Sequence, residues 1–174
     1  MEHRKQYDNK IVLSRTEEHK IPKGKMGLVF CKICNAVYYK KSWHKNLRNY
    51  KNFREDSPIN FSVCPACKMM ENKQFEGEII IYNTPEKISD NLIHLIESFG
   101  HRAYDRDPMH RVIGIKKTRE SIIVTTTENQ LAVKLAKKIK EVFKSASWRT
   151  EIKISYSSAP SDVVYIKLRF NSEF

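Results

Sequence analysis

The second half of the chain alternates between strand-like and helix-like patterns of apolar residues. Residues 78–83 have the sequence Glu-Ile-Ile-Ile-Tyr-Asn, a β-branched run that predicts a strand. Thr84, Pro85 and Glu86 then predict a helix start, because they supply an N-cap hydroxyl, a proline at the first helical position and an acid at the positive end of the helix dipole. Gly100 is expected to end this helix. Its apolar face consists of Ile88, Leu92, Leu95, Ile96 and Phe99.

The same alternation continues after this helix. Residues 101–108 are polar and predict a loop, which two strands at 111–117 and 121–126 are expected to follow. A capping box formed by Thr127 and Gln130 predicts a second helix that ends near residue 144. Its inward face is expected to hold Leu131, Leu135, Ile139, Val142 and Phe143.

Two further strands are expected at 149–156 and 163–170, where apolar and polar side chains alternate. The predicted order of elements is therefore βαββαββ. Antiparallel hairpins with both helices on one face give an α+β sandwich, which we expect to be ferredoxin-like or similar with one added strand.

The first half of the chain is organised by cysteines. They form two knuckles, Cys31-Lys32-Ile33-Cys34 and Cys64-Pro65-Ala66-Cys67, with 29 residues between them. Two tight turns that each present two thiolates are typical of one tetrahedral zinc ion, so we expect a zinc ribbon with four cysteine ligands. Because four sulfurs would fill every coordination position, the Zn²⁺ is expected to be structural.

Disulfides and a redox-active Cys-x-x-Cys pair are the alternative interpretations of these cysteines. The first thirty residues are rich in lysine and contain no apolar signal stretch, so we expect a cytoplasmic location in which thiols stay reduced. A redox pair would also not require a second pair. No apolar run reaches the roughly 18 residues needed to cross a membrane, and no membrane partner is expected.

Positive charge is concentrated in the cysteine-containing half. The chain has 32 Lys and Arg against 20 Asp and Glu, a net charge of +12, which indicates a polyanionic partner. Residues 1–75 carry 16 basic and 7 acidic side chains, whereas residues 76–174 carry 16 and 13. We therefore expect a basic N-terminal arm at 1–26, a zinc ribbon with a basic and aromatic loop at 27–75, and an α+β domain at 76–174.

The segment between the knuckles is the strongest candidate for contact with nucleic acid. Residues 35–54 mix basic and aromatic side chains and contain no acid, a combination suited to phosphates and unstacked RNA bases. Tyr39, Trp43, Leu47 and Tyr50 also have the spacing of one apolar helix face, so a solvated helix packed on the zinc module is the alternative. The candidate contacts, with two from the arm, are Lys23, Lys25, Lys40, Lys41, Trp43, Lys45, Arg48, Lys51 and Arg54.

A second candidate site is the run Thr125, Thr126 and Thr127 at a predicted helix start, where hydroxyls and free backbone amides could bind an anion. Ordinary strand formation and helix capping explain the same residues. The sequence contains no phosphate-binding loop, no nucleophile elbow and no His-Glu-x-x-His pair. We therefore expect a binding protein, with no enzymatic activity and no small-molecule substrate.

Several stretches carry a resemblance to known proteins. They are Cys31-Lys32-Ile33-Cys34 with Val37-Tyr38-Tyr39, Cys64-Pro65-Ala66-Cys67, Ile122-Ile123-Val124-Thr125-Thr126-Thr127, and Leu131-Ala132 with Leu135-Ala136. Through them, most of residues 28–170 resembles small bacterial zinc-ribbon proteins of unknown function. Those proteins are in turn similar to the N-terminal zinc-binding part of the Nmd-three type large-subunit ribosome adaptors of archaea and eukaryotes.

This resemblance implies association with the ribosome or another structured RNA, and it implies the metal-ligand role for the cysteines. The adaptors contain further cysteine pairs and domains that this sequence lacks, so their nuclear export role is not carried over. The leading expectation is a zinc-ribbon RNA-binding protein that binds rRNA on the ribosome as a hibernation, stress or assembly factor. The alternative is a zinc-dependent DNA-binding or protein-binding regulator, in which Arg48, Asn49 and Asn52 would read base edges from a helix.

Overall fold

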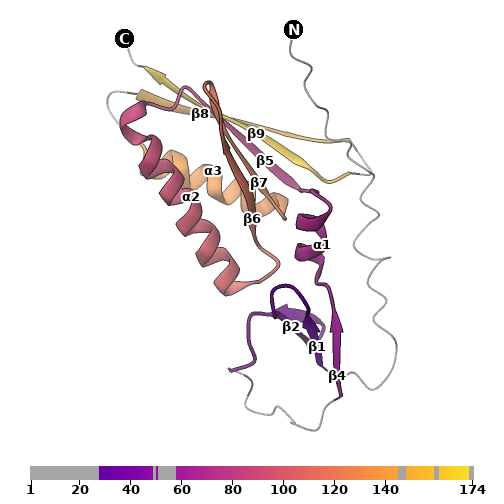
Figure 1. The fold of residues 1–174 in the computed structure, drawn as a ribbon. Coiled ribbons are helices and arrows are strands. Elements are labelled where there is room, and N and C mark those ends of the chain that lie inside the picture. The colour runs from indigo at the N-terminus through magenta and orange to yellow at the C-terminus, as the bar shows by residue number, and fades with distance from the viewer. Residues whose placement is uncertain (1–27, 49, 51–57, 145–147, 159–160, 173–174) are drawn as a thin grey trace.

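The chain forms two β-sheets, which a computed structural model describes for residues 28–48, 50, 58–144, 148–158 and 161–172 (Figure 1). The smaller sheet consists of β1 (Leu28–Cys31), β2 (Val37–Tyr39), β3 (Ser42–His44) and β4 (Ile59–Ser62). Its strand order is β3-β2-β1-β4, with β4 parallel to β1. A short helix, α1 (Pro65–Glu71), follows β4, and together these elements are called the cysteine module below.

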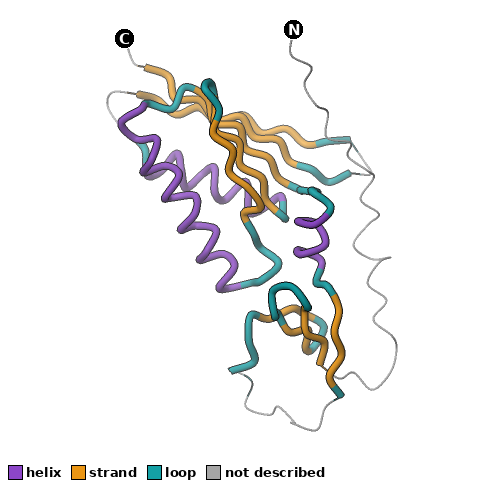
Figure 2. The backbone as a smooth tube through the Cα atoms, viewed as in Figure 1, coloured by secondary structure: helices purple, strands orange, loops and turns teal. Residues whose placement is uncertain are grey.

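The larger sheet and two long helices form the second unit, called the α+β domain below. Its elements in chain order are β5 (Gly77–Tyr82), α2 (Glu86–Arg106), β6 (Val112–Lys117), β7 (Ser121–Thr126), α3 (Asn129–Val142), β8 (Trp148–Tyr156) and β9 (Val164–Ser172). The strand order is β6-β7-β5-β9-β8, and both long helices lie against the same face of the sheet (Figures 1 and 2). The predicted α+β class is thus confirmed.

The two C-terminal strands are arranged differently from an antiparallel ferredoxin-like sheet. β9 lies between β5 and β8, antiparallel to β8 but parallel to β5. Burial explains the placement. Every second residue of β9 from Val164 to Phe170 is buried, whereas β8 buries only Thr150 fully. The more apolar strand takes the interior position, and the more polar strand forms the edge.

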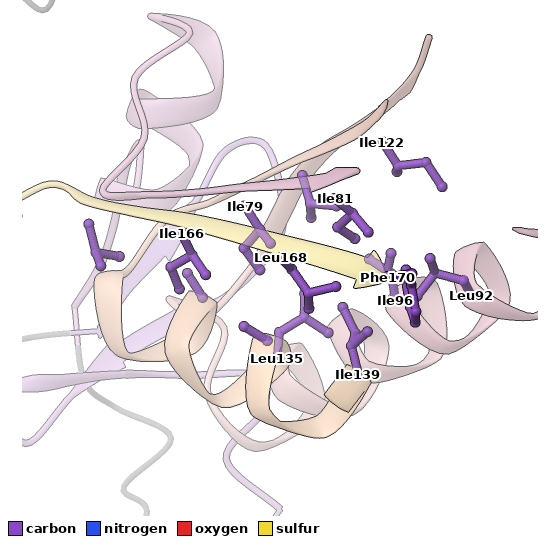
Figure 3. Close-up of a cluster of buried hydrophobic side chains, with 14 residues drawn as sticks. Ile79, Ile81, Leu92, Ile96, Ile122, Leu135, Ile139, Ile166, Leu168 and Phe170 are labelled. Atoms are coloured by element: carbon purple, nitrogen blue, oxygen red, sulfur yellow. The ribbon is translucent and has the colours of Figure 1, made fainter. Parts of the chain in front are cut away.

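The hydrophobic core fills the space between this sheet and its helices. One buried cluster between the sheet and its helices contains Ile79 and Ile81 of β5, Leu92 and Ile96 of α2, and Leu135 and Ile139 of α3 (Figure 3). All six side chains are fully buried. Each contributes roughly 1.5–3 kcal/mol relative to an exposed side chain, so this core is the stable platform of the molecule.

The first predicted helix is longer than expected, because α2 continues through Gly100 to Arg106 and replaces most of the predicted loop. Gly100 does not end the helix. A Cβ atom at Gly100 would lie 2.9 Å from Cγ2 of Val112, so the missing side chain lets β6 approach the helix closely. The polar residues 101–106 form the exposed or half-buried last turns of α2.

The helix starts also differ from the prediction. Pro85 is the N-cap of α2 and no side chain caps this helix, so Thr84 does not act as the expected cap. For α3, the N-cap is Glu128, whose carboxylate accepts a hydrogen bond from the Leu131 amide, and the Thr127–Gln130 capping box is not formed. Val142, expected to face inward, is 46% exposed at the end of α3.

Residues 37–44, which follow the first knuckle, form a β-hairpin, so the alternative of a helix with Tyr39 and Trp43 on one face is wrong. β2 and β3 pair antiparallel with Tyr39 opposite Ser42, which leaves Lys40 and Lys41 as a two-residue turn. Both lysines have positive φ, 47° and 68°, as type I′ hairpin turns require.

Among the described helices, none has the length and apolar character to cross a bilayer.

Candidate metal centre

Four cysteine side chains converge at one end of the cysteine module. The Sγ atoms of Cys31, Cys34, Cys64 and Cys67 all lie within 4.8 Å of one another, and all four cysteines are free thiols. The Cys34 and Cys64 sulfurs are 3.7 Å apart. A tetrahedral ion with metal–sulfur bonds of about 2.3 Å requires sulfurs about 3.8 Å apart, and the Cys34–Cys64 separation matches this value. The four thiols are therefore close enough together to hold a metal ion. We call them the cysteine cage.

The first knuckle is a tight turn that follows β1. The Asn35 amide donates to the Cys31 carbonyl at 3.0 Å, and the Cys31 amide donates to the Ala36 carbonyl at 2.8 Å. The turn requires a left-handed residue, and Asn35 supplies it with φ of 60°. Asparagine tolerates this conformation better than most residues, so the turn that brings Cys31 and Cys34 together is encoded locally.

The second knuckle uses the start of a helix. Cys64 is the N-cap of α1, and its sulfur accepts a hydrogen bond from the Cys67 amide at 3.4 Å. Pro65 occupies the first turn, where its missing N–H leaves no partner unsatisfied. The Cys64 amide in turn donates to the Cys31 sulfur at 3.3 Å. Such N–H···S contacts favour the thiolate form that metal binding requires.

Burial and hydrogen bonds shift the pKa values of Cys31, Cys64 and Cys67 in different directions. Burial alone would raise the pKa of Cys31, but backbone hydrogen bonds from Cys64, Cys34 and Ile33 lower that pKa to about 6. For Cys67, burial raises the pKa to about 11, and for Cys64 burial together with the charge of its neighbours raises the pKa further above its usual value. A cation at the centre would offset this repulsion, because four thiolates then share one positive charge centre.

A small apolar shell surrounds the cage. Ala36 and Ala66 are buried against the cysteines, and Trp43, Val63 and Met109 pack on the outside. The module contains no other buried cluster among its described residues, so the cage is its core. Met109 belongs to the loop between α2 and β6, which means that the α+β domain closes one wall of the shell.

Arg111 is a functional candidate that sequence reasoning missed. Burial would lower its pKa, but interaction with Cys34 and the charges of Cys67 and Cys64 raise that pKa above the usual arginine value. Its Nη1 contacts the Met70 sulfur at 3.8 Å, and its Nη2 is buried with no hydrogen-bond partner among the described residues. Four metal-bound thiolates would carry net negative charge and would be a partner for this guanidinium.

The sequence contains no local signal for Arg111, which reads as the first residue of a strand. Its position depends on contacts distant in sequence. The guanidinium lies over the Tyr104 ring, 4.7 Å from its centroid, and Nε donates to the Pro108 carbonyl at 2.8 Å. Lys45 of the cysteine module pairs with Asp105 at the exposed rim of the same contact.

The threonine run at the end of β7 links the larger sheet to the loop that carries Met109 and Arg111. The Thr127 hydroxyl donates to the Met109 carbonyl at 2.6 Å and accepts from the Arg111 amide at 2.9 Å. The Thr126 hydroxyl donates to the Glu128 carbonyl at 2.8 Å. Both hydroxyls therefore serve internal carbonyl groups, and anion binding by Thr125, Thr126 and Thr127 remains a prediction.

The predicted nucleic-acid residues divide into three groups. Lys40 and Lys41 are exposed at the hairpin tip, and Arg48 is exposed further along the chain. Trp43 packs on the cage and against Tyr38, so it is part of the module core. Lys45 is engaged by Asp105 and lies over Tyr104. The predicted contacts Lys23, Lys25, Lys51 and Arg54 lie outside the described residues.

Two aromatic rings lie next to Lys40 at the hairpin tip. The Lys40 ammonium lies 5.5 Å from the Tyr39 ring centroid and 5.6 Å from that of Tyr50. The two rings meet edge to face at 5.2 Å, and Tyr50 also contacts the His44 ring. His44 is thereby occupied in the hairpin, where its Nε2 lies 3.0 Å from the Tyr39 carbonyl oxygen.

Comparison of the chain with models of protein families, with curated proteins and with solved structures gives no match.

Proposed function

We propose that this chain is a cytoplasmic zinc-ribbon protein that binds RNA and associates with the ribosome. One structural Zn²⁺ would be held by Cys31, Cys34, Cys64 and Cys67. The convergence of four thiols supports zinc, because an all-sulfur tetrahedral site is the common structural zinc site. The lysine turn at the hairpin tip is the observation that carries the RNA proposal.

Lys40 and Lys41 occupy a turn that favours asparagine and glycine. Their positive φ values disfavour side chains that have a Cβ atom, by roughly 1–2 kcal/mol per residue. Two adjacent ammonium groups on one tip also repel each other. Unfavourable backbone conformations in ordered proteins cluster at functional sites, and an anion bound at the tip would compensate for both effects.

The surroundings of the tip favour RNA among polyanions. Tyr39 and Tyr50 place aromatic rings beside Lys40, so phosphate and base could be contacted together. The cysteine cage lies under the hairpin and would hold it rigid, which lowers the entropy lost on binding.

The ribosome is proposed as the source of this RNA from the resemblance of the two knuckles to those of ribosome adaptors. A role in assembly, stress or hibernation would follow from where on the ribosome the protein binds. The alternative regulator would read duplex DNA through a helix that carries Arg48, Asn49 and Asn52. Arg48 lies in no helix, and Asn49 and Asn52 lie outside the described residues.

Paired lysine substitutions test the proposal. Lys40→Ala/Lys41→Ala should weaken binding to ribosomes about ten-fold and reduce the salt dependence by about 0.7–0.9 log unit for each lost phosphate contact. The matched control is Lys137→Ala/Lys140→Ala, which removes the same charge from the exposed side of α3. Sedimentation of lysates at low and high salt measures ribosome association, and anisotropy with purified rRNA fragments measures affinity. Equal losses in both variants, or binding only to duplex DNA, would refute the proposal.

A further inference from the structure

The face of the larger sheet opposite α2 and α3 carries a second concentration of charge. Strand pairing places exposed basic side chains from three strands on this face, which we call the outer sheet face. Glu78 and Glu151 are the acids that the same alternation places there. The basic residues are Lys116 of β6, Arg149 and Lys153 of β8, and Lys167 and Arg169 of β9.

Two lysines of this face stand directly opposite each other. Lys153 and Lys167 form a cross-strand pair between β8 and β9, an arrangement that destabilises a sheet when both residues are charged. Glu151 lies 3.6 Å from Lys153 and offsets part of the repulsion. These residues, with Arg169 and Asn171, line a depression of about 340 Å³. A phosphate in this depression would neutralise the remaining excess of positive charge.

An aromatic and guanidinium pair lies beside the depression. Arg169 is opposite Tyr82 of β5, and its guanidinium lies over the Tyr82 ring at 4.9 Å from the centroid. Ile80, the next residue of β5 on this face, is opposite Lys167. Rings and guanidinium planes that lie on a sheet are surfaces on which unpaired bases stack.

We propose that the outer sheet face binds single-stranded RNA, with Lys153 and Lys167 at phosphates and the Tyr82–Arg169 pair stacking on a base. The charge of the face complements the RNA backbone, and the aromatic and guanidinium pair suits unpaired bases better than a duplex. The choice of RNA rests on the proposed function, but the surface is distinct from the lysine turn of the cysteine module. The two surfaces would let one molecule contact two segments of RNA.

The test uses the full chain and a fluorescein-labelled oligouridine of about 12 nucleotides, with affinity measured by anisotropy over a salt series. Lys153→Ala/Lys167→Ala/Arg169→Ala should weaken binding at least ten-fold and lower the salt slope by about 0.7 per lost phosphate contact. Tyr82→Ala should weaken binding about five-fold or more, which is the lower end of the contribution from one stacked base. The matched control is Lys134→Ala/Lys137→Ala/Lys140→Ala on α3.

Circular dichroism of each variant establishes that the fold is retained, and Tyr82→Phe, which keeps the ring, should bind as the unsubstituted chain does. Unchanged oligouridine affinity in the triple variant, or an equal loss in the α3 control, would overturn this inference. If the Lys40→Ala/Lys41→Ala variant still lost ribosome binding, the proposed function would stand without the outer sheet face. If no variant changed binding to any RNA, both proposals would fail.

Discussion

The hydroxyl of Thr127 donates a hydrogen bond to the carbonyl oxygen of Met109 at 2.6 Å, and this contact links the larger sheet to the cysteine cage. Met109 packs on the cage, and Arg111, two residues later, places its charge beside the thiols. Thr127 is 1% exposed and also accepts a hydrogen bond from the Arg111 amide. One buried hydroxyl thus fixes the loop by which the α+β domain contacts the cysteine cage.

Replacing Thr127 by valine should destabilise the fold by about 1–3 kcal/mol, because the Met109 carbonyl and the Arg111 amide lose a buried partner. Thr127→Ser keeps the hydroxyl and should retain most of the stability. Urea unfolding in saturating zinc measures both. Thr125→Val is the matched control, since the Thr125 hydroxyl makes no hydrogen bond to a described residue. A Thr127→Val variant as stable as Thr125→Val would show that the linking contact is unimportant.

Metal removal should unfold the cysteine module and leave the α+β domain folded. The cage is the module's core, and metal binding to such sites contributes on the order of 10 kcal/mol to folding. The chain has two tryptophans, of which Trp43 packs on the cage and Trp148 packs on the larger core. In Trp148→Phe, chelation should shift the fluorescence of Trp43 to longer wavelength.

In Trp43→Phe, the fluorescence of Trp148 should stay nearly unchanged on chelation, because Trp148 donates to the Phe143 carbonyl within the α+β domain. Elemental analysis should find one zinc per chain before chelation and none afterwards. Equal shifts of both tryptophans would mean that the two units unfold together.

Gly100→Ala should destabilise the protein although alanine is the better helix former. The gain in helix propensity is about 1 kcal/mol, but the new Cβ would lie 2.9 Å from Cγ2 and 3.1 Å from Cβ of Val112. We expect a net loss of about 1–2 kcal/mol from this overpacking. Thermal unfolding measures it, with Gly114→Ala as control because a Cβ there meets nothing nearer than 3.7 Å. Val112→Ala should rescue Gly100→Ala; failure of rescue would assign the loss to another cause.

The Lys45–Asp105 pair should make the module contact dependent on pH. Lys45 lowers the pKa of Asp105, chiefly by its hydrogen bond and then by its charge. A carboxyl whose pKa is lower in the folded state stabilises the fold at pH values above its unfolded-state pKa of about 3.9. This contribution is lost as the pH falls through the folded-state pKa. In Lys45→Gln, the pKa of Asp105 should rise towards that ordinary value.

Carbon-13 NMR of the Asp105 carboxyl over a pH series measures this change. Lys138→Gln is the control, because Lys138 pairs with Glu141 on the same turn of α3 and not with Asp105. A rise in the Asp105 pKa in the control, or none in Lys45→Gln, would show that the pair does not set this pKa.

The cage and the class of the fold could be predicted from sequence because both depend on local patterns. Two Cys-x-x-Cys turns form within a few residues each, and apolar periodicity follows the elements that carry the core. Gly100 was misjudged because its role depends on Val112, a contact that no local pattern encodes. Arg111 was missed for the same reason, since its position is fixed by Thr127 and Tyr104.

The hairpin between the knuckles was not evident in sequence because the spacing of the aromatic residues favoured a helix. Tyr39 and Trp43 fit a helix face, and the turn between β2 and β3 lacks the asparagine and glycine that usually mark a hairpin. Because lysines occupy both turn positions, there was no local sequence signal for a hairpin.

The same lysines give the sharpest prediction on the lysine turn. Lys40→Asn/Lys41→Gly installs the residues that a type I′ turn prefers at φ of 47° and 68°, whereas Lys40→Ala/Lys41→Ala removes the same two charges and keeps the unfavourable conformation. The Asn-Gly variant should therefore be more stable than the Ala-Ala variant by about 1–2 kcal/mol, measured by urea unfolding followed through Trp43 fluorescence. Both should lose RNA affinity equally, because both lack the charges. An Asn-Gly variant that binds RNA as tightly as the unsubstituted chain would show that the lysines are not there for their charge.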